Sequence, residues 1–133
     1  LTLVSYGSTL NLCIQVLPVL EELGISVELL DVQTLLPFDL SHDIVKSLQK
    51  TNRLLIVDED VSAGATAYIL EKILVEQSGY YHLDEAPQTL SAKDHRPAYG
   101  SDGDYFSKPS IDDIVEKVYE MMSKANPNAF PTL

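Results

Sequence analysis

Short apolar runs alternate along this chain with segments in which apolar residues recur every three or four positions. Continuous apolar runs are typical of strands buried on both faces, and the longer spacing is typical of helices that bury one side. This pattern predicts strands at residues 1–6, 25–32, 53–58 and 88–92. It predicts helices at residues 10–23, 40–50, 62–77 and 111–123.

Strands that alternate with helices indicate a parallel sheet covered on both faces. Right-handed crossovers then give a three-layer α/β/α fold with a doubly wound, mainly parallel sheet. The loops at the carboxyl ends of the strands are the usual functional edge of such a sheet. Residues 7–9, 33–34 and 58–60 are all expected there.

Turn and cap residues support these boundaries. Ser8 or Thr9 is a candidate N-cap of the first helix, and Gly24 a candidate C-cap. Ser110 stands just before the last helix. We therefore expect one domain over residues 1–124, followed by a tail over residues 125–133.

Charge and composition narrow the class of protein. Nine Lys and Arg residues stand against 20 Asp and Glu, a formal net charge of −11. This balance argues against binding to nucleic acid or to an anionic membrane, and suits a basic protein partner. No apolar stretch approaches a membrane span, no signal-peptide pattern is visible, and the single cysteine, Cys13, is expected to be a buried, inert thiol. The expected compartment is the cytoplasm.

Asp58, Glu59 and Asp60 follow the third predicted strand and are the most conspicuous candidates for chemistry. Carboxylates can act as general acid or base, or bind a divalent cation. Three consecutive side chains do not converge on one ion, however, and acids before a helix also stabilise its dipole. Local stabilisation or contact with a partner is the favoured interpretation.

Other motifs predict no complete active site. The turn at Gly7 lacks the glycine pattern of a nucleotide-binding loop, and residues 100–106 lack the frame of a calcium loop. The three histidines lie far apart in sequence, and only His95, between Asp94 and Arg96, is kept as a candidate site residue. The residues alone therefore indicate an α/β domain without a self-sufficient catalytic centre.

Several segments, taken in order, resemble one known family. These are VSYGS opening a helix, GISVELLDVQTLLPFD, the strand LLIVDED with its turn, HLDEAP, and the final helix SIDDIVEKV. They are similar to the C-terminal transketolase-type domain of the thiamine-dependent decarboxylating component of 2-oxo acid dehydrogenase complexes. The resemblance covers nearly the whole chain before its tail, and it implies the strand order 2-1-3-4.

The resemblance also implies what this chain would do. Thiamine diphosphate and magnesium would be bound by the two preceding domains of the parent enzyme, so that no cofactor, metal or catalytic residue is expected in this chain. Asp84 and then Glu85 are the expected contacts for the basic subunit-binding module of the acyltransferase core. Contacts with other domains or subunits, in a homo- or hetero-oligomer, are expected from Asp58, Glu59, Asp60, His95 and Tyr99.

Two alternatives stay open at this point. The chain could be the C-terminal domain of transketolase or of deoxyxylulose-phosphate synthase, which share this architecture. It could also be a free-standing α/β module that binds a protein or a ligand. Within the first interpretation, the substrate of the parent enzyme is either pyruvate or a branched-chain 2-oxo acid.

Overall fold

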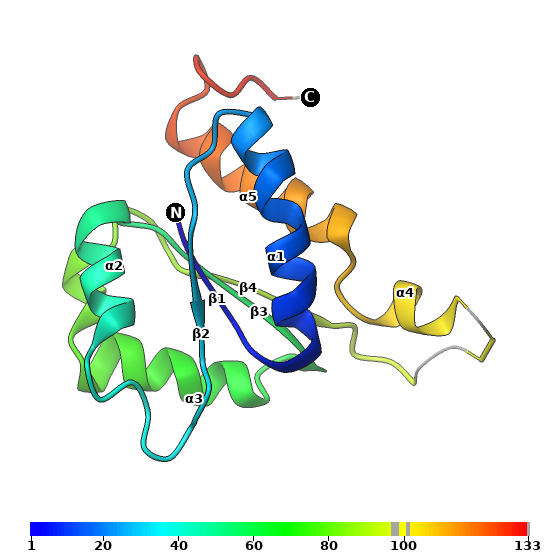
Figure 1. Cartoon of the computed structure of the whole chain (residues 1–133), viewed down its shortest axis with the longest axis horizontal. Coiled ribbons are helices and arrows are strands. Elements are labelled where there is room, and N and C mark those ends of the chain that lie inside the picture. The colour runs from blue at the N-terminus through cyan, green and yellow to red at the C-terminus, as the bar shows by residue number, and fades with distance from the viewer. Residues whose placement is uncertain (97–98, 101, 133) are drawn as a thin grey trace.

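A four-stranded parallel sheet forms the centre of the molecule, with helices on both of its faces (Figure 1). The structure is a computed structural model that describes residues 1–96, 99–100 and 102–132. The strands are β1 (Thr2–Ser5), β2 (Glu28–Asp31), β3 (Leu54–Val61) and β4 (Gln88–Ala92), in the spatial order β2-β1-β3-β4. Both the α/β class and the predicted strand order are confirmed.

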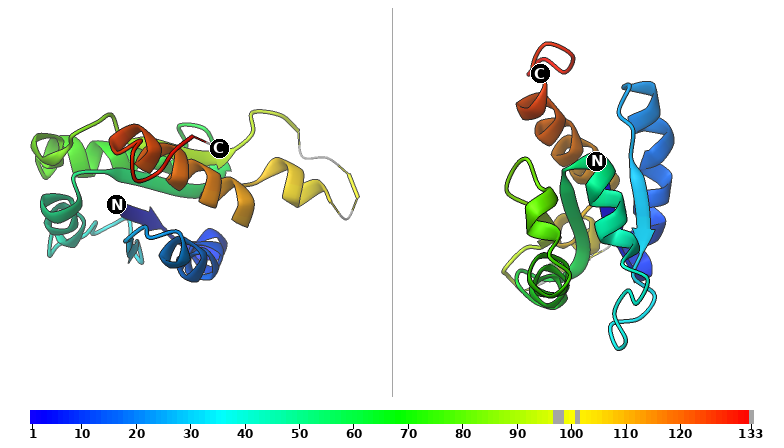
Figure 2. Two further views of the ribbon diagram at one scale, coloured as in Figure 1. Left: turned by 90° about the horizontal axis from the view of Figure 1, so that it is seen from above. Right: turned by 90° about the vertical axis from the view of Figure 1, so that its left-hand side faces the viewer.

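Five α-helices and two shorter helical segments complete the described part of the chain. The α-helices are α1 (Gly7–Glu22), α2 (Asp43–Thr51), α3 (Ala65–Glu71), α4 (Gly103–Ser107) and α5 (Ile111–Ala125). The π-helix η1 (Lys72–Glu76) continues α3, and the 3-10 helix η2 (Gly79–His82) follows it. In Figure 2 the segment containing α4 extends beyond the rest of the molecule.

The continuous apolar run of β3 is explained by burial on both faces. Leu55 and Val57 pack with α1 and α5, whereas Leu54 and Ile56 pack with α2, α3 and η1. Successive side chains of a strand point to opposite faces, so a central strand must be apolar at every position. The two cores lie on opposite sides of one sheet.

Several predicted boundaries are wrong by a few residues. The second strand was expected over residues 25–32, but β2 pairs only from Glu28 to Asp31, because β1 has only four residues, Thr2 to Ser5, to pair with it. Helix α1 starts at Gly7 rather than at residue 10, and its N-cap, Tyr6, makes no side-chain capping bond. Residues 103–107 were expected to be loop and form α4.

The residues after α5 return to the body of the domain. Phe130 packs against the core between α1 and α5, and its ring lies 6.1 Å from that of Tyr119. The Tyr119 hydroxyl donates to the carbonyl of Pro131 at 2.9 Å. A tail boundary at residue 125 stays a prediction, but part of that segment is packed on the domain.

Candidate protein-interaction site

The predicted site residues fall into two groups, one at the edge formed by the carboxyl ends of the strands and one at the edge formed by their amino ends. Asp58, Glu59 and Asp60 lie toward the carboxyl end of β3, and His95 and Tyr99 follow the carboxyl end of β4. Asp84 and Glu85 lie just before the amino end of β4, beside Arg53, which precedes β3. All strands run in the same direction, so these groups belong to opposite ends of the sheet.

The sequence predicts the three acids in the turn after the third strand. In the structure they lie on β3 itself. Val57 pairs with Leu90 and Val61 with Ala92, so three residues of β3 face one residue of β4. Extra residues in one strand form a β-bulge, which redirects side chains locally. Within β3, Asp58 is completely buried (0% exposed), while Glu59 and Asp60 are exposed.

The buried Asp58 and the partly buried Tyr6 interact at this edge. One Asp58 carboxylate oxygen accepts from the backbone N–H of Asp60 at 3.1 Å, and the other has no hydrogen-bond partner in the described structure. Burial of the Tyr6 phenol and the neighbouring Asp58 carboxylate raise the pKa of Tyr6 well above its ordinary value. Asp58 therefore has no surface of its own to offer a partner.

Glu59 links three segments that meet at this edge. Its carboxylate accepts from the Ser8 hydroxyl at 2.6 Å and from Lys108 Nζ at 3.4 Å. The Ser8 hydrogen bond, and then Lys108, lower the pKa of Glu59, so this carboxylate is ionised at neutral pH. The start of α1, the end of β3 and the segment between α4 and α5 are thus held together by one side chain.

Asp60 shapes the turn that leads into α3. Its carboxylate accepts from the backbone N–H of Val61 at 2.8 Å. A Cβ atom at Gly64 would lie only 2.4 Å from Asp60 Oδ2, so a larger residue there would displace the Asp60 side chain. The glycine at position 64 therefore allows this carboxylate to approach the turn closely.

His95 and Tyr99 belong to the segment that connects β4 with α4. His95 Nδ1 lies 2.8 Å from the carbonyl of Arg96, and its ring lies 5.4 Å from Phe106. Tyr99 is 83% exposed and contacts the Arg96 guanidinium through both its hydroxyl and its ring. Both residues are on the same edge as Glu59 and are accessible for an interface.

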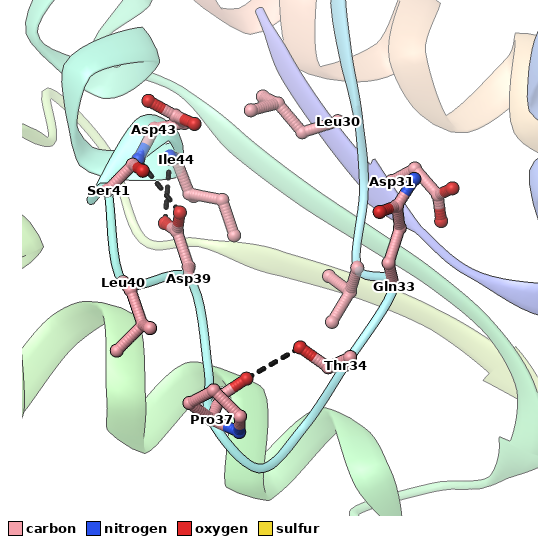
Figure 3. Close-up of a pocket in the computed structure, with 11 residues that line it drawn as sticks. Leu30, Asp31, Gln33, Thr34, Pro37, Asp39, Leu40, Ser41, Asp43 and Ile44 are labelled. Atoms are coloured by element: carbon pink, nitrogen blue, oxygen red, sulfur yellow. Dashed lines mark hydrogen bonds between the residues drawn. The ribbon is translucent and has the colours of Figure 1, made fainter.

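A pocket of about 310 Å³ opens beside the end of β2, in the loop that leads to α2 (Figure 3). Asp39 points toward the start of α2 and accepts from the backbone N–H groups of Asp43 and Ile44 at 2.9 and 3.0 Å. Thr34 Oγ1 donates to the Pro37 carbonyl and closes the loop. The capping of α2 by Asp39 was not predicted from the sequence.

At the opposite edge, Arg53 contacts both predicted docking acids. Its guanidinium lies 3.4 Å from Glu85 and 3.8 Å from Asp84. The side chains of Arg53 and Glu85 are mostly covered, whereas that of Asp84 is 61% exposed. Glu85 is therefore held inside the domain, and Asp84 presents its carboxylate to solvent.

The described residues also bear on metal binding, on the single cysteine and on membrane insertion. They contain no group of three or more His, Cys, Asp or Glu that could hold a metal ion. Cys13 is buried in the core, and this burial raises the pKa of its thiol to about 11. Across the same residues, no helix combines the length and apolar character required to cross a bilayer.

The fold and these two edges define an α/β domain whose prominent polar groups lie on surfaces at the ends of its strands. The family profile described as the C-terminal domain of transketolase matches residues 1–112. The chain belongs to this family.

Individual proteins are also similar in sequence to this chain. The chain is 31% identical over 123 residues to pyruvate dehydrogenase E1 component subunit beta of Mesostigma viride, covering 92% of this chain and 37% of the relative. It is 29% identical over 117 residues to the protein of that name in Rhizobium meliloti, covering 88% and 25%. It is 38% identical over 88 residues to the mitochondrial 2-oxoisovalerate dehydrogenase subunit beta of Chaetomium thermophilum, covering 65% and 18%. The chain thus spans roughly a third or less of the curated relatives it matches.

Proposed function

We propose that this chain is the C-terminal interface and docking domain of the decarboxylating component of a 2-oxo acid dehydrogenase complex. The parent enzyme would oxidatively decarboxylate pyruvate or a branched-chain 2-oxo acid in the cytoplasm and transfer the acyl group to lipoyl. The names of its relatives support this assignment, since they are β subunits of two such dehydrogenases. The isolated domain would be inactive.

Thiamine diphosphate and magnesium would be bound elsewhere in the parent enzyme. The described residues of this chain provide no set of ligands that fits a metal ion. The turn at the start of α1 contains only Gly7 and lacks the glycine pattern of a phosphate-binding loop. The role of this chain would therefore lie in assembly.

The observation that carries the docking proposal is the exposed carboxylate of Asp84. Arg53 lies closer to Glu85, at 3.4 Å, than to Asp84, at 3.8 Å, and the more exposed Asp84 carboxylate can also attract a basic partner. The partner would be the basic subunit-binding module of the acyltransferase core. The opposite edge, with Glu59, Asp60, His95 and Tyr99, would contact other domains or subunits of the same enzyme.

Calorimetric titration of this chain with the basic module tests the docking proposal. Asp84→Asn should weaken binding by about 2 kcal/mol or more, because it removes a paired interfacial charge. Binding should also weaken as salt is raised. Asp94→Asn is the matched control, since Asp94 is an exposed acid that follows the opposite end of β4.

The outcomes separate clearly. Binding that is lost in Asp84→Asn and kept in Asp94→Asn supports docking at the edge formed by the amino ends of the strands. A folded wild-type chain that does not bind the module contradicts the docking proposal. Equal binding by all three proteins shows that the module contacts a different surface.

A further inference from the structure

A shallow groove of about 540 Å³ runs beside the predicted docking acids. Its lining comprises Tyr80, Tyr81, Leu83, Asp84, Glu85, Ala86 and Pro87. Tyr80 and Tyr81 are 66% and 82% exposed, and their rings meet edge to face with centroids 5.9 Å apart. An exposed aromatic pair beside an exposed carboxylate is therefore a feature of this groove.

The position of the two tyrosines is fixed by the packing of η2. A Cβ atom at Gly79 would lie 2.7 Å from the carbonyl oxygen of Ile73, so only glycine allows η2 to approach η1 this closely. Asn52 Nδ2 donates to the carbonyl of His82 at 2.9 Å, and the backbone N–H of Asp84 donates to the carbonyl of Asn52 at 3.0 Å. The aromatic pair and Asp84 are thus held in one fixed arrangement.

Exposed tyrosines in such an arrangement favour a protein partner. Tyrosine supplies a large apolar surface with a polar end and loses little conformational freedom on binding. It is enriched at interfaces, and a rigid aromatic pair is a suitable centre for one. Leu83 packs against the core beneath α2, α3 and η1, and so anchors the groove to the rest of the domain.

The charges around the groove select a cationic partner. Arg53 neutralises Glu85 at 3.4 Å, while Asp84 is more distant from it and more exposed. The π faces of the tyrosines and the Asp84 carboxylate both attract cations. A planar guanidinium can stack on a ring while it pairs with a carboxylate, which an ammonium group cannot do.

We infer that Tyr80, Tyr81 and Asp84 together form the binding surface for an arginine side chain of a basic partner segment. This inference rests on the proposed docking function, and it adds the aromatic contacts and the type of side chain recognised. Arg53 acts here as a positioning residue, because it holds Glu85 within the domain.

The test is calorimetric titration of the full chain with the basic subunit-binding module. Tyr80→Leu/Tyr81→Leu keeps apolar side chains at both positions and removes both rings, and it should weaken binding about tenfold. Tyr105→Leu is the control, because Tyr105 is an exposed tyrosine on α4 at the opposite edge and should leave the Kd unchanged. Circular dichroism melting shows that each variant is folded.

A second arm replaces each arginine of the module by lysine. At the contacting arginine, this change should weaken binding to the wild-type chain and have little further effect on the Tyr80→Leu/Tyr81→Leu variant. If that variant binds like wild type while Asp84→Asn is weakened, the inference is overturned and the docking proposal stands. If the wild-type chain does not bind the module at all, both are overturned.

Discussion

At the scale of single residues, three adjacent acids have three different environments. Asp58 is buried, Glu59 connects Ser8 with Lys108, and Asp60 shapes the turn over Gly64. Acidic residues at neighbouring positions therefore serve different purposes, which sequence spacing does not reveal. Of the three acids, only Glu59 and Asp60 are exposed and can take part in the proposed interface of this edge.

The buried position of Asp58 has a consequence for stability at high pH. The pKa of Tyr6 is raised by burial and by Asp58, so Tyr6 stays neutral in the folded chain at a pH where it ionises in the unfolded chain. The free energy of unfolding should therefore fall as the pH rises above about 10, up to the folded-state pKa of Tyr6.

Urea unfolding between pH 8 and pH 11 measures this effect. Tyr6→Phe should remove part of the decline, and Asp58→Asn should reduce it by lowering the pKa of Tyr6. Tyr81→Phe, at an exposed tyrosine, serves as the control. An equally steep decline in wild type and Tyr6→Phe would exclude Tyr6 as its cause.

At the scale of elements, the ends of α5 and β3 are set in different ways. Helix α5 begins at a capping box, in which Ser110 accepts from the backbone N–H of Asp113 and the Asp113 carboxylate accepts from the backbone N–H of Ser110. These groups are close in sequence, and the sequence places Ser110 just before the last predicted helix. β3 instead continues beyond the predicted end, because β4 pairs with Val61 across the bulge.

The capping box predicts a defined stability change. Ser110→Ala should reduce the free energy of unfolding by about 1 kcal/mol, since it leaves the backbone N–H of Asp113 without its acceptor. Ser41→Ala, at an exposed serine outside the helices, should have a much smaller effect. Denaturant unfolding of the two variants gives the comparison, and equal stability of both would contradict the capping role.

At the scale of the whole molecule, the two proposed interaction surfaces are separated by the length of the sheet. β3 has 8 residues and spans roughly 26 Å at about 3.3 Å per residue. Charges at its two ends are therefore more than a Debye length apart, which is about 8 Å at physiological ionic strength. Docking and subunit assembly should be separable by mutation.

Glu59→Gln/Asp60→Asn tests this separation. In the parent enzyme these changes should weaken association between subunits, as measured by sedimentation velocity. In this chain they should leave the Kd for the basic module within about twofold of wild type, because the charges are screened over that distance. An unchanged assembly state of the parent would contradict the interface role of this edge. Weaker binding of the basic module would contradict the separation of the two surfaces.

The alternation of apolar patterns by itself determined the α/β class and the approximate position of each strand. It could do so because a central strand buried on both faces requires apolar residues throughout, as in Leu54 to Val57. The strand order followed from the family resemblance in the sequence. The packing of the tail beyond residue 125 and the short helix α4 were harder to predict from the sequence, because short segments carry little periodic signal.

Only the tertiary structure decided the environment of each site residue. Asp58 lies in a bulge between β3 and β4, and the pairing of Arg53 with Glu85 joins residues 32 positions apart. The exposure of Tyr80 and Tyr81 beside Asp84 depends on how η2 packs against η1. The first two are contacts between segments distant in sequence, and the third is a close backbone approach between neighbouring segments. The local pattern of apolar and polar residues does not encode any of them.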